Sequence, residues 1–171
     1  AELLLVVISY GSEERRSQSF EALVESPAHI AGTLPSWADP AIILFTSGST
    51  GPAKGVTHSF ETLGRMITSF IRGCHATSDD IVMSSGSLSH IGAIEVCFTG
   101  LAAGARVVIP RNRDADSLLP MLQQHRPTIL TGLPVTLFGL IRDPRTTPDD
   151  LVSLRLCCVG GDKVPAELER E

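Results

Sequence analysis

Residues 46–56 read Thr46-Ser47-Gly48-Ser49-Thr50-Gly51-Pro52-Ala53-Lys54-Gly55-Val56. This segment follows an apolar run at residues 41–45, which predicts a strand buried on both faces. It precedes residues 59–73, whose apolar side chains recur at helical spacing and predict an amphipathic helix. The expected layout is therefore a strand, a loop rich in glycine and hydroxyl groups, and then a helix.

This layout suits a bound phosphate group. Glycines let the backbone approach an anion closely, and successive N–H groups can surround its oxygens. Ser47, Ser49 and Thr50 add hydroxyl donors, and Lys54 adds a positive charge. Each charge-assisted hydrogen bond contributes roughly 1.5–3 kcal/mol, so a few of them can hold a polyphosphate. The alternative is a surface turn with one solvated lysine.

The segment does not match the P-loop of kinases and ATPases, which requires G-x-x-x-x-G-K followed by serine or threonine. Counted from Gly48, the second glycine position holds Ala53 and the hydroxyl position holds Gly55. A P-loop NTPase is therefore disfavoured.

The segment instead resembles the phosphate-binding signature of the adenylate-forming superfamily, which comprises acyl-CoA synthetases, adenylation domains of peptide synthetases, and luciferases. The pattern in that family is close to Thr/Ser-Ser-Gly-Ser/Thr-Thr-Gly-x-Pro-Lys-Gly-Val after a hydrophobic strand. This chain departs from it at one position, where Ala53 replaces the usual proline and a proline stands one place earlier at Pro52.

Two further segments resemble the same superfamily. Residues 88–93 resemble a loop that lines its carboxylate pocket, with His90 and Gly92 near the family's histidine and glycine, although the glycine is one residue closer and a proline is missing. The alternative is that His90 merely caps a helix. The turn Gly160-Gly161-Asp162 resembles the family's glycine-rich turn against adenine, where any Cβ would intrude on the base. Taken alone, it is an ordinary turn.

The resemblance implies a fold and a reaction. The fold is α/β, with a layered, mostly parallel sheet flanked by helices, as part of the large N-terminal domain of an adenylate-forming enzyme. The reaction activates a small-molecule carboxylate with ATP and Mg2+ to an acyl adenylate and passes the acyl group to CoA or a pantetheine thiol. Arg126-Pro127-Thr128 and residues 154–168 look most like fatty-acid CoA ligases.

The resemblance also implies roles for individual residues. Lys54 would be the catalytic residue, offsetting negative charge as pyrophosphate leaves. His90 and Gly92 would line the substrate pocket. The ATP-binding residues would be Thr46, Ser47, Gly48, Ser49, Thr50, Gly51, Lys54, Gly160, Gly161 and Asp162.

The pattern of elements supports a parallel sheet. Strands are expected at residues 81–83, 105–109, 128–130 and 154–159, and helices at 90–103, from Asp114 or Asp116 to 125, at 134–142 and from 164 onward. Since ligands collect beyond the carboxyl ends of such strands, the loops at Ser47, Ser85 and Gly160 should be neighbours.

The expected domain organisation has two parts. Residues 1–40 should hold an N-terminal strand at 1–9, a short helix or loop at 17–25, and an irregular connection. Residues 41–171 should form one α/β nucleotide-binding unit, truncated at both ends.

Composition excludes several other classes. The chain has 171 residues, 43% of them hydrophobic and 5% aromatic, with a net charge of −5. Such a chain has an aliphatic core and no basic field for nucleic acid. No apolar run is long enough for a membrane span. Cys74, Cys97, Cys157 and Cys158 lack metal-site spacing, so buried thiols in the cytoplasm are expected. The oligomeric state is not indicated.

The chain lacks much of the machinery of the family. No Tyr-Gly-x-Thr-Glu motif, whose glutamate holds magnesium, follows Gly161. The ribose-binding aspartate, the hinge and the C-terminal lid with its lysine are missing too. We therefore expect a fragment of an ATP-dependent acyl-CoA synthetase that makes no acyl adenylate by itself. The alternative is a non-catalytic nucleotide-binding or structural module.

Overall fold

The computed structural model describes residues 7–9, 17–19, 34–48, 51–166 and 170. The chain forms two compact units, Ala1–Pro35 and Ser36–Glu171. In the first unit, strand β1 (Val7–Ser9) pairs in parallel with β2 (Ser17–Ser19). The prediction of a helix or loop over residues 17–25 is wrong for β2, because pairing with β1 overrides weak local preferences, and residues 20–25 lie outside the described residues.

The second unit contains a parallel sheet of four strands in the order β6-β5-β7-β8. The strands are β5 (Ile81–Ser84), β6 (Arg106–Val108), β7 (Ile129–Gly132) and β8 (Leu156–Val159). The helices along this part of the chain are α3 (Ile91–Ala102), α4 (Ala115–His125), α5 (Pro134–Ile141) and the short α6 (Pro148–Leu151). Only α6 was not predicted. Its capping box between Thr147 and Asp150 forms a turn that sequence periodicity does not reveal.

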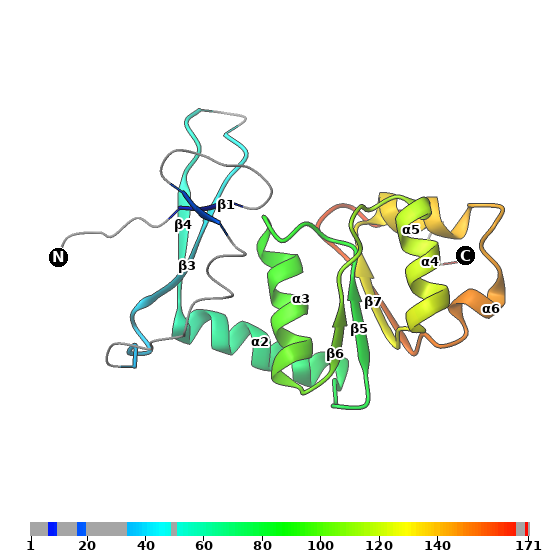
Figure 1. Cartoon of the computed structure of the whole chain (residues 1–171), viewed down its shortest axis with the longest axis horizontal. Coiled ribbons are helices and arrows are strands. Elements are labelled where there is room, and N and C mark those ends of the chain that lie inside the picture. Colours follow the sequence, from blue (N-terminus) through cyan, green and yellow to red (C-terminus); the bar gives the residue numbers. More distant parts are fainter. Residues whose placement is uncertain (1–6, 10–16, 20–33, 49–50, 167–169, 171) are drawn as a thin grey trace. The chain divides into compact units, whose positions relative to one another are not determined.

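Helices cover both faces of this sheet, as Figure 1 shows. Because successive residues of a strand point to opposite faces, Val82 packs with α2 (Phe60–Cys74) and α3, whereas Met83 packs with α4 and α5. On β7, Ile129 packs on the same face as Val82, and Leu130 packs on the same face as Met83. The predicted fold class, a mostly parallel sheet flanked by helices, is confirmed.

The segment around residues 46–56 differs from the prediction. Strand β3 (Pro40–Phe45) pairs antiparallel with β4 (Gly55–Ser59), so the loop connects the two strands of a hairpin. Helix α2 begins only after β4. Val56 and Thr57 are β-branched residues, which favour extended backbone, and they therefore favour this second strand. Burial of β3 on both faces is also wrong, since Ile43 is 54% and Phe45 68% exposed.

Two smaller expectations also fail. Residues 164–166 are not helical, and residues 167–169 of the expected last helix lie outside the described residues. Cys74 and Cys97 are buried as predicted, but Cys157, on the edge strand β8, is exposed. Burial, reinforced by Cys158 with its sulfur 4.0 Å away, raises the pKa of Cys74 to about 11. Among the described helices, none has the length and apolar character needed to cross a membrane.

An ion pair whose carboxylate is buried joins the amino ends of β5, β7 and β8. Asp80, directly before β5, is 5% exposed, and its carboxylate accepts hydrogen bonds from Arg155 Nε at 2.8 Å and Nη2 at 2.7 Å. Thr128 Oγ1, directly before β7, donates to the same carboxylate at 2.6 Å. Arg155, directly before β8, also donates to the carbonyls of Cys74 and His75 at the end of α2.

The charge state of Asp80 follows from these contacts. Hydrogen bonds from Arg155, with smaller contributions from Thr128 and Thr77, hold the pKa of Asp80 well below its usual range, although burial opposes them. A carboxyl whose folded pKa is depressed stabilises the fold above its unfolded pKa, near 3.9, and loses this contribution as pH falls through the folded value.

We predict that Asp80→Asn lowers the free energy of unfolding of the chain by roughly 1.5–3 kcal/mol at pH 7, because charge-assisted hydrogen bonds are lost. The measurement is urea denaturation monitored by circular dichroism. Asp79→Asn is the matched control, since Asp79 is exposed and its carboxylate has no partner among the described residues. As pH falls from about 4 toward the folded pKa of Asp80, the difference in stability between wild type and Asp80→Asn should shrink. Equal stability at pH 7 would contradict the assignment.

Candidate functional site

A cavity of about 630 Å³ lies beyond the carboxyl ends of β5, β7 and β8. This is the edge at which ligands bind in parallel α/β sheets. Helices α2 and α3, the loops after the three strands, and Arg113 supply the rest of its wall. The lining residues are Phe70, Ser84, Gly86, Ser87, His90, Ile91, Gly92, Ala93, Glu95, Val96, Arg113, Thr131, Gly132, Leu133, Cys158, Val159, Gly160 and Gly161.

Hydrogen bonds join the three strand ends into one rim. Ser85 N and Ser85 Oγ both donate to Thr131 O at 2.9 Å, and Gly160 N donates to Gly132 O at 3.2 Å. A Cβ at residue 132 would collide with Ser85 Oγ, so glycine there lets the Ser85 side chain keep its hydrogen bond to Thr131 O. The loops at Ser85 and Gly160 are therefore neighbours, as predicted.

The loop at Ser47 does not belong to this rim. Strand β3, which precedes it, pairs with β4 in a separate two-stranded sheet. Among the described residues of this loop, none lines the cavity. The prediction that all three loops follow strands of one parallel sheet is therefore wrong for Ser47.

The two glycines of the turn after β8 are under different steric constraints. Gly161 has a φ of 81°, and a Cβ there would lie 2.9 Å from Leu133 Cδ2. Gly160 has no such constraint, because a Cβ on it would meet nothing within 4 Å. The backbone at Gly160 thus faces open space, which suits contact with a flat ligand. Asp162 is outside the cavity lining, and its carboxylate accepts a hydrogen bond from Lys163 N at 2.7 Å.

His90 stands at the N-cap of α3, but its side chain makes no capping hydrogen bond. The alternative that its imidazole only caps the helix therefore has no capping hydrogen bond to support it. The side chain is exposed and lines the cavity together with the nearby Gly92. His90 is free to donate a hydrogen bond to a ligand.

Glu95 is a cavity residue that sequence reasoning missed. It follows Gly92 by three residues and so lies on the same face of α3. Its side chain is partly buried, and burial raises the pKa of its carboxyl. Within the described residues, no group forms a hydrogen bond or ion pair with it. The other titratable groups that line the cavity are those of His90, Arg113 and Cys158.

The hairpin loop is closed by its own backbone. Thr46 N donates to Lys54 O at 3.0 Å, and Lys54 N donates to Thr46 Oγ1 at 3.1 Å. Gly48 has a φ of 67°, and a Cβ there would lie 2.9 Å from Gly51 O, so the loop requires glycine. Ser49 and Thr50 lie outside the described residues.

The open side of this loop retains free donors. The amides of Ser47 and Gly48 have no hydrogen-bond partner among the described residues, and the side chain of Lys54 is exposed. Thr46 closes the loop, because its hydroxyl already accepts the Lys54 amide. These donors can bind an anion.

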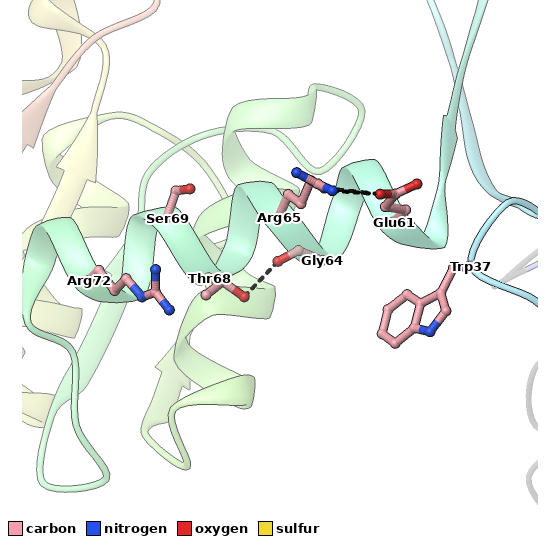
Figure 2. Close-up of a pocket in the computed structure, with 7 residues that line it drawn as sticks. All are labelled: Trp37, Glu61, Gly64, Arg65, Thr68, Ser69 and Arg72. Carbon is pink, nitrogen blue, oxygen red and sulfur yellow. Dashed lines mark hydrogen bonds and ion pairs between the residues drawn. The ribbon is translucent and has the colours of Figure 1, made fainter.

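A second, more open depression of about 780 Å³ runs along α2 (Figure 2). Its lining residues are Trp37, Glu61, Gly64, Arg65, Thr68, Ser69 and Arg72. Arg65 pairs with Glu61 at 2.8 Å, and Thr68 Oγ1 donates to Gly64 O at 2.8 Å, so much of its polar surface is already engaged. No strand end or glycine turn contributes to it, and we do not assign it a ligand.

The described residues contain no group of three or more histidine, cysteine, aspartate or glutamate side chains placed to hold a metal ion.

Comparisons with known proteins agree with this architecture. Residues 2–171 match the family described as AMP-binding enzyme. The chain is 33% identical over 156 residues to an indoleacetate–CoA ligase of Aromatoleum aromaticum, which covers 90% of this chain and 31% of that protein. It is 32% identical over 134 residues to a 4-hydroxybenzoate–CoA/benzoate–CoA ligase of Rhodopseudomonas palustris, covering 76% and 25%.

A solved structure is also similar to this chain. ATP-bound MatB from Rhodopseudomonas palustris superimposes with a TM-score of 0.77 at 26% identity, over 88% of this chain and 30% of that one. The chain thus spans about a third or less of the length of these proteins.

We predict that Gly161→Ala lowers the free energy of unfolding by about 1–2 kcal/mol, because an L-residue is strained at positive φ. Gly160→Ala is the matched control, and its stability should stay within about 0.5 kcal/mol of wild type. Urea denaturation of both variants is the measurement. Equal effects at the two positions would show that the turn is not built as described.

Proposed function

The chain belongs to the family of AMP-binding enzymes, and on that premise we propose that the full-length protein activates a carboxylate with ATP and transfers the acyl group to CoA. The observation that carries the proposal is the cavity at the carboxyl edge of the sheet, where His90 and the backbone of Gly160 and Gly161 face one space. Such an arrangement can place a carboxylate beside a nucleotide.

ATP fits two groups of residues. The open face of Gly160 suits the flat adenine, since no side chain stands over the backbone there. The free amides of Ser47 and Gly48 and the ammonium of Lys54 suit phosphate oxygens. Gly51 completes the turn, and we assign Ser49 and Thr50 to the same phosphate contacts. When ATP is bound, its α-phosphorus is the electrophile that the carboxylate attacks.

The residues of the chain orient the reactants and offset charge. His90 donates a hydrogen bond to the substrate carboxylate, and Gly92 leaves room beside it. Lys54 stabilises negative charge that develops on the departing pyrophosphate. Magnesium enters with ATP, and since the described residues offer no ligand cluster, we assign no step to the metal.

We propose that the carboxylate is aromatic. The fatty acid expected from the sequence finds no support in the named relatives, which are ligases for indoleacetate and for 4-hydroxybenzoate or benzoate. The apolar side chains of Phe70, Ile91 and Leu133 line the cavity and suit a ring. We also propose that the protein acts in the cytoplasm, where its thiols stay reduced.

We predict that Lys54→Ala in the full-length protein slows ATP–pyrophosphate exchange by more than ~10-fold, equivalent to 1.4 kcal/mol or more of transition-state stabilisation. Lys54→Arg should retain part of the rate because it keeps the charge. Arg65→Ala is the control, since this exposed cation pairs with Glu61 on α2. Unchanged exchange by Lys54→Ala would reject the proposed role.

We predict that the chain of 171 residues forms no acyl adenylate by itself, because it spans only 31% of the indoleacetate–CoA ligase that it matches. The measurement is pyrophosphate release from ATP with aromatic and fatty acids. Calorimetry separates the alternative of a non-catalytic nucleotide-binding module, which would bind ATP without turnover even in the full-length protein. Turnover by the isolated chain would contradict the prediction.

A further inference from the structure

The cavity contains one carboxylate that the proposed reaction does not use. Glu95 lies on α3, lines the cavity, and has no hydrogen-bond or ion-pair partner within the part of the chain that the structure describes. The side chain of Glu95 is partly buried, so its carboxylate faces the cavity with its accepting oxygens accessible. Arg113 lines the same cavity but forms no ion pair with it. A ligand that donates a hydrogen bond to Glu95 would gain a charge-assisted contact.

Helix α3 sets the distance between Glu95 and His90. The two residues are five positions apart, and a helix advances about 1.5 Å per residue, so they are separated by about 7.5 Å along the axis. Both side chains line the same cavity, so one aromatic molecule can contact both.

His90 and Glu95 stand at positions that favour opposite charges in a ligand. The amino end of α3, where His90 stands, carries the positive end of the helix dipole and favours an anion. An ionised Glu95 repels an anion. The carboxylate of a substrate therefore belongs at the His90 end, and the opposite end of the substrate lies at Glu95.

We propose that Glu95 selects aromatic carboxylic acids that carry a hydroxyl or ring N–H donor at the end remote from the carboxylate. This inference rests on the proposed function and adds the substrate class. The donor gives its hydrogen bond to a Glu95 carboxylate oxygen, while the substrate carboxylate accepts one from His90. Around the ring, Phe70, Ile91 and Leu133 provide apolar contact.

The test uses ATP–pyrophosphate exchange by the full-length protein with matched pairs of acids that differ only in the donor. The pairs are 4-hydroxybenzoate with 4-methoxybenzoate, 4-hydroxyphenylacetate with 4-methoxyphenylacetate, and indole-3-acetate with its N-methyl derivative. Benzoate and phenylacetate, which lack a substituent at the remote end, show how the size of that substituent affects kcat/KM. For at least one pair, kcat/KM should favour the donor by about 10-fold or more, as expected for a hydrogen bond to a charged group.

Variants assign this preference to Glu95. Glu95→Leu removes the acceptor, so the ratio within the pair should fall to about 1, whereas Glu95→Gln keeps a carbonyl acceptor and should retain part of it. Glu61→Leu is the matched control, because Glu61 lies on α2, pairs with Arg65 and does not line this cavity. Its ratio should equal that of wild type. The ratio reports specificity, which a general loss of stability would not change.

The outcomes separate this inference from the function on which it rests. If the protein adenylates aromatic acids but shows no preference for the donor, or if Glu95→Leu and Glu95→Gln keep the full preference, the inference is overturned and the proposed function stands. If no acid of the panel supports exchange, both are overturned.

Discussion

The ion pair of Asp80 with Arg155 is the interaction on which the rest of the sheet depends. Asp80 stands directly before β5, Thr128 before β7 and Arg155 before β8, so one carboxylate joins three strands at their amino ends. The backbone carbonyl of Asp80 also accepts a hydrogen bond from Arg106 N at the start of β6. In a parallel sheet a shift of one residue would turn every side chain to the opposite face. Fixing the amino ends therefore fixes which residues reach the carboxyl edge.

The two edges of the sheet consequently serve different purposes. At the amino edge the polar groups are satisfied by one another, which is the condition under which buried charges stabilise a fold. At the carboxyl edge the backbone groups of Ser85 and Gly160 are paired within the rim, but His90 and Glu95 have no partner among the described residues. Polar groups left available in a cavity are what a binding site requires. The separation lets the site vary without weakening the sheet.

The sequence predicted the layered sheet well because its signals are local. The apolar runs, the N-cap Asp114 and the first helical residue Pro134 specify their elements without reference to distant residues. The hairpin of β3 and β4 was missed because residues 55–59 become a strand only through pairing with β3. Glu95 was missed for a similar reason, since its significance comes from a cavity built by β5, β7 and β8. The roles of Lys54, His90 and Gly160 remain proposals, because they depend on ligands.

The position of Glu95 and His90 is set by how closely α3 packs on the sheet. Gly100, five residues after Glu95 on α3, lies so near β5 and β6 that a Cβ would come within 2.6 Å of Val107 Cγ2 and 3.3 Å of Val82. Ala93, Val96 and Thr99 are buried along the same helix. A helix held this tightly cannot rotate to turn Glu95 away from the cavity without opening the core. The place of this carboxylate on the cavity wall is thus fixed by packing further along the helix, and a hydrogen-bond donor of the ligand can meet it there.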